Sequence, residues 1–256
     1  MHMDGQRMNK TGKKLLAQGL GLIFPPRCPV CDELLEPEEH ALWGKGIHEN
    51  CKKQLVCIEP PVCFRCGKPV ESSRRELCYD CQKGTKHRGF SQGRALFLYQ
   101  GKMKDMMYRF KYQNRREYAY YFAKYAAKQY ESWIQSIHPD VVIAVPIHKS
   151  RKRQRGYNQA EVFAKELADK MGLAWEKNLI VRVKKTKPMK NLDDRDRKKN
   201  LKNAFQIRDS VVKYNKILVV DDIFTTGSTI NEVGKLLLSA GAKEIYFLCI
   251  CIGKGC

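Results

Sequence analysis

Two adjacent aspartates and the hydroxyl-rich loop that follows them are the residues best suited to chemistry. Asp221 and Asp222 come directly after the apolar run 217–220, and residues 225–229 read Thr-Thr-Gly-Ser-Thr. Backbone N–H groups and hydroxyls at the start of a helix can hold a phosphate monoester, helped by the helix dipole. Carboxylates one step earlier can accept hydrogen bonds from a ribose diol or help to hold a hydrated magnesium ion. A buried strand with an aspartate cap and a polar turn is the alternative, although the loop is unusually dense in Thr, Gly and Ser for a plain turn.

This stretch resembles the phosphoribosyl-pyrophosphate (PRPP) motif of type I phosphoribosyltransferases. The resemblance implies that Asp221 and Asp222 contact the ribose hydroxyls and are the catalytic acids, and that Mg²⁺ accompanies PRPP. It also implies that the loop cradles the 5′-phosphate through Thr225, Thr226, Gly227, Ser228 and Thr229. No GxxxxGK[ST] occurs in the sequence and no GxGxxG follows a strand, so neither a Walker loop nor a dinucleotide-binding fold is supported.

Cysteines at metal-ligand spacing mark a second region, between residues 28 and 81. Three CxxC pairs and one HxxC pair have the gap by which a tight turn points two ligands at one ion. Thiolate and imidazole ligands favour zinc, and four ligands per ion leave no open position, so two structural zinc sites are expected. Grouped in chain order, the ligands are Cys28, Cys31, His48 and Cys51 for one ion and Cys63, Cys66, Cys78 and Cys81 for the other.

Swapped pairings between these groups and disulfides are the alternatives, and Cys57, which has no paired cysteine, is expected to bind no metal. The segment around the cysteines is poor in apolar residues and rich in turn formers. Zinc binding should therefore supply much of its folding free energy. Zinc ribbons serve either as platforms for nucleic-acid and protein contacts or as architecture, and both roles remain open.

Positive charge is the dominant feature of the composition. The chain carries 48 Lys and Arg against 27 Asp and Glu, a formal net charge of +21. Such an excess attracts polyanions, either nucleic acid or a nucleotide pyrophosphate, with a solvated surface as the alternative. Basic residues cluster in 149–155 and in 182–202. The nucleic-acid contacts expected from these clusters are Lys149, Arg151, Arg153, Arg155 and Arg197.

Alternation of strand-like and helix-like segments predicts an α/β domain with a buried parallel sheet. The loops after Pro146 and Val220 both leave carboxyl ends of strands, so we expect them to share one pocket. Strands are expected at 90–99, 140–146, 179–183, 204–207, 217–220 and 245–252. Helices are expected at 102–130 with a break near 113–114, from 156–159 onward and at 230–240. Residues 149–155 and 184–200 are expected as basic loops. The aromatic residues of 108–125 either stack nucleic-acid bases or pack inward as an ordinary helix face.

Beyond the PRPP motif, the order of several segments resembles the ComF family, which are late-competence proteins of bacterial DNA uptake with relatives such as GntX. The segments are the CxxC ribbons, Arg155-Gly-Tyr-Asn-Gln159, Thr186-Lys-Pro188 and Arg197-Lys-Lys-Asn200. The resemblance covers about residues 25–250 and implies a type I phosphoribosyltransferase-like parallel sheet preceded by a small zinc-ribbon domain. Val145 to Lys149 would then be the pyrophosphate loop, which makes Lys149 a PRPP ligand. His48 replaces the family's usual cysteine, and Met189 replaces its usual glutamine.

The resemblance implies a competence protein for DNA uptake in natural transformation that binds single-stranded DNA and PRPP. Its expected partners are other competence proteins, namely helicase-like and DNA-processing factors. Two alternatives stay open: an active phosphoribosyltransferase on an unknown acceptor, and a zinc-ribbon scaffold for competence partners. The residues leave open whether the protein is an enzyme.

We expect an amphipathic lead-in at 1–24, a zinc-ribbon domain at 25–88 and a phosphoribosyltransferase-like domain at 89–256. No apolar run approaches the ~20 residues of a membrane span. Residues 15–24 imitate a signal peptide but lack a small-x-small cleavage site. The expected location is therefore cytoplasmic.

Overall fold

The computed structural model describes residues 27–35, 46–83, 89–185, 201, 203–208, 210–211 and 213–253. The chain divides into two compact units, Met1–Gln54 and Leu55–Cys256. The second group of four cysteines thus belongs to the same unit as the sheet. The lead-in at 1–24, the Thr186–Pro188 segment, Met189 and the Arg197–Asn200 segment lie outside the described residues.

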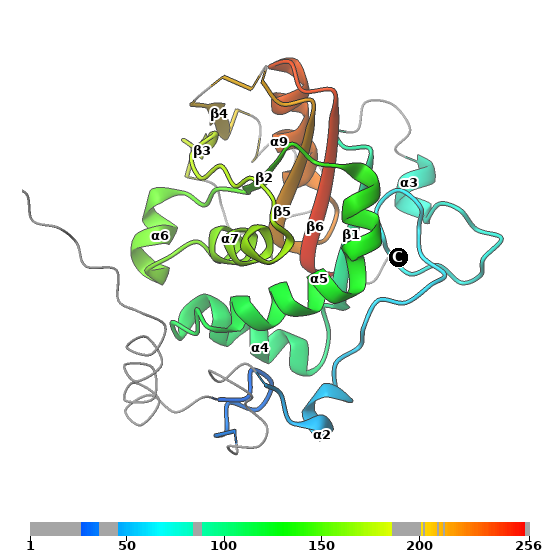
Figure 1. Ribbon diagram of the computed structural model, residues 1–256, viewed down its shortest axis with the longest axis vertical. Helices are drawn as coiled ribbons and strands as arrows, with labels where there is room; N and C mark the ends of the chain where they lie inside the picture. The colour runs from blue at the N-terminus through cyan, green and yellow to red at the C-terminus, as the bar shows by residue number, and fades with distance from the viewer. Residues whose placement is uncertain are drawn as a thin grey trace, which may run out of the picture. The chain divides into compact units, whose positions relative to one another are not determined.

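A four-stranded parallel sheet forms the centre of the second unit (Figure 1). Its order is β1 (Gln92–Leu98), β6 (Glu244–Ile252), β5 (Lys216–Phe224) and β2 (Val141–Ala144), and every neighbouring pair is parallel. Strands β2, β5 and β6 contain apolar runs rich in Val, Ile, Leu and Cys, as expected when both faces of a sheet are covered. The α/β class predicted from the sequence is confirmed.

Helices cover both faces of this sheet. Ile217 and Val219 of β5 share a buried cluster with Val233 and Leu237, whereas the alternate residues of β5 point to the opposite face. That opposite face is packed by α7, which in turn packs on α5. The helices concerned are α9 (Ser228–Ser239) on the first face, and α7 (Gln159–Met171) and α5 (Tyr118–Ile137) on the second. In the part of the chain that the structure describes, no helix has both the length and the apolar character needed to cross a bilayer.

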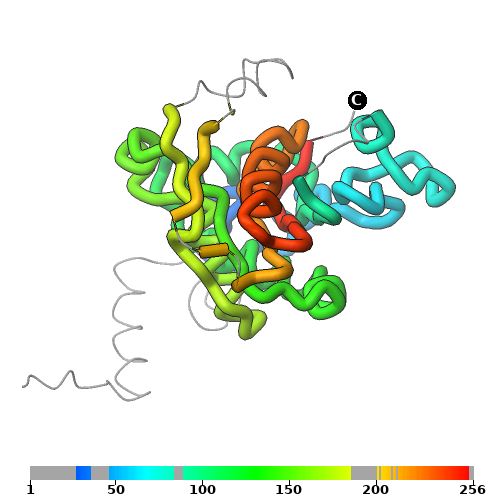
Figure 2. The backbone as a smooth tube through the Cα atoms, turned by 90° about the horizontal axis from the view of Figure 1, so that it is seen from above, coloured from blue at the N-terminus to red at the C-terminus, as the bar shows by residue number. Residues whose placement is uncertain are grey.

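The remaining elements include one that the sequence reading did not predict. The basic segment expected as a loop is a helix, α6, which ends at Gly156 with φ at +78°. Figure 2 shows the antiparallel pair β3–β4 beside α9. The bounds are α2 Glu49–Lys52, α3 Tyr79–Lys83, α4 Lys102–Tyr112, α6 Lys149–Arg155, β3 Ile180–Arg182 and β4 Phe205–Ile207.

The chain that surrounds the second cysteine group continues the sheet beyond β1. The Ile58 N–H donates to the Leu96 carbonyl at 2.9 Å, and the Leu98 N–H donates to the Val56 carbonyl at 2.8 Å. Further along β1, the Gly93 N–H donates to the carbonyl of Arg65 at 2.7 Å. An open edge strand is prone to pair with other chains, and these bonds cover it. The second ribbon is thereby part of the α/β core.

Candidate phosphate site and metal centres

The two aspartates lie within strand β5, which is longer than the sequence predicted. On the β2 side, pairing stops where the Val145 N–H donates to the Val220 carbonyl at 2.9 Å. On the β6 side, pairing continues to Phe224. The last residue of β2, Ala144, pairs with Val220, so no strand lies beside Asp221 and Asp222 on that side. The two acids therefore sit on a rigid strand next to an open edge.

A lysine that the sequence analysis did not assign to this site holds one of the carboxylates. Lys111, in the last turn of α4, places its Nζ 2.9 Å from Oδ2 of Asp222. The two acids are also linked, since the Asp222 N–H donates to Oδ1 of Asp221 at 2.8 Å. Both partners of the ion pair are largely shielded from solvent, with side chains 16% and 19% exposed.

The environment drives the pKa values of the two carboxyl groups apart. Burial and the neighbouring Asp222 charge raise the pKa of Asp221 to about 8, against the opposing pull of Lys111 and Arg182. For Asp222, burial acts to raise the pKa, but Lys111 and Arg155 together outweigh it and lower the pKa. Near neutral pH the pair therefore carries about one negative charge, centred on Asp222.

More positive charge surrounds this pair than two acids can balance. Burial and the charge of Arg151 lower the pKa of Arg182 to about 10, although Asp221 acts in the other direction. Burial and the charge of Arg155 lower the pKa of Arg151 as well. Guanidinium groups held together this closely favour the binding of a further anion.

The loop after β5 opens onto the start of α9. Gly227 precedes the helix with φ at +78°, and a Cβ there would lie 2.7 Å from Cζ of Phe224. The first intrahelical bond runs from the Asn231 N–H to the Gly227 carbonyl, so the helix itself leaves the three preceding N–H groups without an acceptor. Within the described structure, α9 has no side-chain cap and no acid in its first turn. These features suit a bound phosphate.

Hydroxyl groups of the loop are already oriented toward one another. Oγ1 of Thr226 lies 2.9 Å from Oγ of Ser228, and Thr225 is exposed. The base of the loop is fixed because Phe224 stacks on Phe247 at 4.6 Å between ring centroids. The loop is therefore anchored at its strand end, with Thr225 exposed and Ser228 buried at the helix start.

The Arg155–Gln159 segment, whose role the sequence left open, fastens the end of α4. The Tyr157 hydroxyl donates to the Phe110 carbonyl, and Nε2 of Gln159 lies 3.4 Å from the same oxygen. Gln159 Nε2 is also 3.5 Å from the Lys111 carbonyl. These contacts hold the backbone of Lys111 beside the acidic pair.

Asn158 links the same segment to the sheet. Its Nδ2 donates to the Val145 carbonyl at 3.0 Å, and its Oδ1 accepts from the Ala160 N–H at 3.2 Å as the cap of α7. The motif thus connects the ends of β2 and α4 through buried side chains. It acts as a positioning element for the site.

The basic residues expected to bind nucleic acid fall into two groups. Arg151 and Arg155 are half-buried and interact electrostatically with Asp222, as the pKa shifts of Arg151 and Asp222 indicate. Lys149 and Arg153 are exposed on α6. Arg197 lies outside the described residues. The structure thus gathers part of the predicted set at the acids and adds two residues that the sequence analysis missed, Lys111 and Arg182.

His148 caps α6. Its Nδ1 accepts from the Ser150 N–H at 3.2 Å and lies 2.8 Å from the Ser150 hydroxyl. Desolvation and the charges of Lys149 and Arg182 lower its pKa, so the ring is neutral at neutral pH. The Nδ1 atom of His148 is thus engaged in capping α6.

Two clusters of thiol and imidazole ligands form in the groups predicted by chain order. In each, one donor atom from every residue lies within 4.8 Å of all the others. The members are Cys28, Cys31, His48 and Cys51 in the first, and Cys63, Cys66, Cys78 and Cys81 in the second. Cys57 belongs to neither and bridges to Phe97 of β1.

The donor sets fit tetrahedral zinc. In the first cluster, Nδ1 of His48 lies 3.3 Å from Sγ of Cys31, while Nε2 lies 3.1 Å from the Leu34 carbonyl. A proton on Nε2 would leave the Nδ1 lone pair free for a metal, the usual arrangement of a ligating histidine. In the second cluster the four thiols are buried, and Sγ of Cys66 and Cys78 are 3.6 Å apart.

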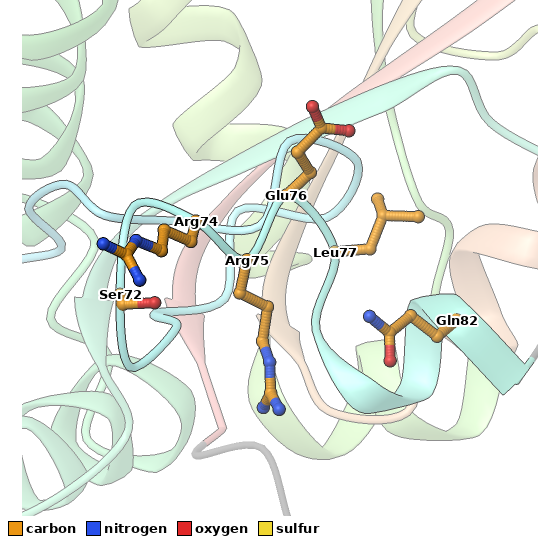
Figure 3. A pocket seen from close by; sticks show the side chains of 6 residues that line it. All are labelled: Ser72, Arg74, Arg75, Glu76, Leu77 and Gln82. Atoms are coloured by element: carbon orange, nitrogen blue, oxygen red, sulfur yellow. The ribbon is translucent and has the colours of Figure 1, made fainter.

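A surface hollow of about 500 Å³ is lined by side chains from the segment 72–77 and from α3 (Figure 3). Its lining residues are Ser72, Arg74, Arg75, Glu76, Leu77 and Gln82. Arg75 is also within 3.5 Å of Glu71, which partly neutralises it. The hollow contains none of the binding residues predicted from the sequence.

Comparison with known proteins defines the class first. Residues 117–256 match the family model of the phosphoribosyl transferase domain, and residues 19–82 match that of the double zinc ribbon domain. A solved purine phosphoribosyltransferase from Pyrococcus horikoshii Ot3 is 19% identical and covers 52% of this chain and 74% of its own, with a TM-score of 0.33.

Curated relatives then define the family. Competence protein F of Haemophilus influenzae is 33% identical over 78% of this chain and 87% of its own length. DNA utilization protein YhgH of Salmonella typhimurium is 30% identical over 80% and 96%, and Competence protein ComFC of Streptococcus pneumoniae is 31% identical over 77% and 83%. The chain belongs to the ComF family, whose members join a double zinc ribbon to a phosphoribosyltransferase-like domain.

Proposed function

We propose that this protein handles DNA during natural transformation and binds both PRPP and single-stranded DNA at the carboxyl edge of its sheet. The names of its relatives support the competence role. The observation that carries the ligand assignment is the convergence of an acidic pair, an open helix start and a surplus of cations at one edge of the sheet.

Each part of PRPP has a complementary group in this arrangement. The 5′-phosphate would lie on the loop 225–229, where the α9 N–H groups are available. Asp221 and Asp222 would accept the ribose hydroxyls, and the pyrophosphate would face Lys149, Arg151 and Arg155. Carboxylate ligands fit Mg²⁺, which when bound neutralises part of the pyrophosphate charge.

Single-stranded DNA would extend from this edge over α6. Five of the seven residues of α6 are basic, and none is acidic. Binding through phosphate contacts releases counterions, so affinity should fall steeply as salt rises. We further propose a cytoplasmic location and contact with other competence proteins, the helicase-like and DNA-processing factors expected for the family.

One preparation tests this function with three ligands. Calorimetry with PRPP and Mg²⁺, and fluorescence anisotropy with single-stranded and duplex DNA, should give saturable binding of PRPP and a preference for the single strand. A salt titration should give a log–log slope that corresponds to several released counterions. A flat salt response would reject the DNA assignment, and absence of PRPP binding would reject the site assignment.

Turnover is the second candidate function, favoured by the crowded guanidinium groups beside the acids. Arg151, Arg155 and Arg182 would stabilise charge that develops on a departing pyrophosphate, which is the main electrostatic route to rate acceleration in such a reaction. Release of pyrophosphate from PRPP, dependent on an added acceptor and lost in Asp221→Asn, would establish it. If neither PRPP nor DNA binds while partners co-purify through residues 25–85, a scaffold role replaces both proposals.

A further inference from the structure

Two tyrosines on α4 are exposed although they are large and partly apolar. Tyr108 is 58% exposed and Tyr112 is 48% exposed. Their ring centroids are 5.2 Å apart at an interplanar angle of 43°. Among the aromatic residues of 108–125, Phe110, Tyr118, Tyr121 and Phe122 are buried instead. Of the three aromatic residues of α4, Phe110 therefore packs inward, whereas Tyr108 and Tyr112 lie on the outside.

The spacing on α4 places this pair on a continuous outer stripe. Residues four apart on a helix are neighbours, so the exposed Lys104 precedes Tyr108 and Tyr112 along the same line. The inner face of α4 is formed by Met103, Met106, Met107 and Phe110, all buried. Loss of either tyrosine ring would leave this packing in place. The two rings therefore do not contribute to the hydrophobic core.

Positive charge lies directly against Tyr112. The Arg155 guanidinium carbon lies 5.0 Å from the centroid of the Tyr112 ring, and its Nη2 donates to the Tyr112 hydroxyl at 3.1 Å. Nη1 of Arg155 is held by Oε1 of Gln159 at 3.1 Å, so the cation is fixed in place. Aromatic rings with adjacent cations are the contact set that single-stranded nucleic acids use.

The same turn of α4 connects the tyrosines to the acidic pair. Lys111 bonds Asp222, and its chain neighbour Tyr112 bonds Arg155. Phosphates of a strand lying on α6 would follow the basic side chains, while its unpaired bases would reach α4. A duplex offers no free base faces along its length, so this surface would discriminate between the two forms.

We propose that Tyr108 and Tyr112 form a stacking platform for unpaired bases of single-stranded DNA, with Arg155 as its cationic edge. This inference rests on the proposed DNA binding. It assigns the residues that distinguish single-stranded from duplex DNA. Stacking is sequence-tolerant because every base has a flat face. The platform thus favours single strands of any sequence.

The test uses the full-length protein and fluorescence anisotropy with an oligothymidylate of about 20 nucleotides, longer than the usual site of one binding fold. Tyr108→Ala/Tyr112→Ala should bind it about 10- to 100-fold more weakly than the wild-type protein, with an unchanged salt slope, because stacking releases no counterions. Tyr108→Phe/Tyr112→Phe keeps both rings and should bind within about threefold of wild type. An abasic oligonucleotide of equal length should show no difference between wild-type and alanine proteins.

The outcomes separate this inference from the function on which it rests. If wild-type protein fails to bind the oligothymidylate, the DNA half of the proposed function is wrong. If the wild type binds and the alanine variant binds equally well, the platform is wrong and DNA binding stands. If the alanine variant is poorly folded by circular dichroism, Tyr108→Leu/Tyr112→Leu removes the rings with helix-favouring residues, and wild-type-like affinity there would overturn the proposal.

Discussion

The second cysteine cluster and the acidic edge of the sheet are two polar sites in one compact unit, built on opposite principles. The thiols of Cys63, Cys66, Cys78 and Cys81 are buried and leave a four-ligand ion no open position. At the acidic edge, Asp221 and Asp222 remain partly exposed beside an unfilled helix start. The first site is closed and suits a permanent ion, and the second is open and suits an exchangeable anion.

The two sites also differ in how their charges are balanced. Zinc would offset two of the four thiolate charges within the cluster itself. At the acidic edge the described cations Lys111, Arg151, Arg155 and Arg182 exceed the two acids, and the pKa of Arg182 falls to about 10 through burial and repulsion from Arg151. A site in which neighbouring guanidinium groups repel one another gains stability when an anion enters. This contrast separates a folding element from a binding element.

Breaking the closed site should have the largest effect on stability. Cys63→Ser/Cys66→Ser should lower zinc content from two ions per chain to one and reduce the melting temperature by more than about 10 °C. Structural zinc contributes about 10 kcal/mol or more in small metal domains, and about 1 kcal/mol corresponds to 2–4 °C at this chain length. The loss of stability extends to the sheet because the backbones of Ile58 and Arg65 are hydrogen-bonded to β1.

The matched control is Cys28→Ser/Cys31→Ser, which removes ligands from the other compact unit. It should lower zinc content equally while the melting of the sheet changes by less than about 3 °C. Plasma emission spectrometry gives the metal content, and calorimetry gives the melting. Equal destabilisation by both variants would show that the two clusters do not differ as described.

Removing the Lys111 cation from the open site should have an intermediate effect. Lys111→Met should destabilise the free protein by about 1–3 kcal/mol, since it leaves Asp222 without its partner in a poorly solvated position. It should also raise the pKa of Asp222 and weaken PRPP binding about tenfold. Urea unfolding and calorimetry measure these changes. Lys102→Met, at the exposed start of the same helix, is the control and should alter neither quantity.

A further prediction concerns Asp221 and is a gain in stability. Its pKa is raised to about 8 in the folded protein from an ordinary value of 3.8, first by burial. Between these values the folded state binds more protons than the unfolded state, so this residue makes stability fall as pH rises toward about 8. Asp221→Asn should remove that slope and raise the melting temperature near pH 8 above that of the wild type. A wild-type-like pH profile in the variant would show that Asp221 is ionised normally.

The ligands of the closed site could be predicted from the sequence with only their pairing left open, whereas the open site could be predicted only in part. CxxC spacing specifies ligands through local turns, so chain order alone gave both clusters. The acids and the loop after β5 were evident because they are contiguous in sequence. Lys111 and Arg182 come from α4 and β3, far from the motif, and only the fold brings them there. No local signal marks Lys111 among the 48 basic residues, and Arg182 is marked only as the first residue of the basic cluster 182–202.

Two element boundaries show the same limit. Strand β5 runs to Phe224 because pairing with β6 continues beyond the end of β2, and this depends on neighbours rather than on the polar residues themselves. Residues 149–155 form a helix despite their charge, since His148 caps the start and Gly156 ends it. The platform tyrosines could not be separated from the buried aromatic residues by spacing alone. Tertiary packing decides which face of α4 is covered.

The most direct test of the central proposal is calorimetric titration of PRPP with Mg²⁺ into the wild-type protein and Asp221→Asn/Asp222→Asn. The variant keeps the size of both side chains, so its zinc content and circular dichroism should match those of the wild type. We expect saturable binding to the wild type and none to the variant. Equal PRPP affinity in the two proteins would contradict the assignment of this acidic edge as the phosphoribosyl site.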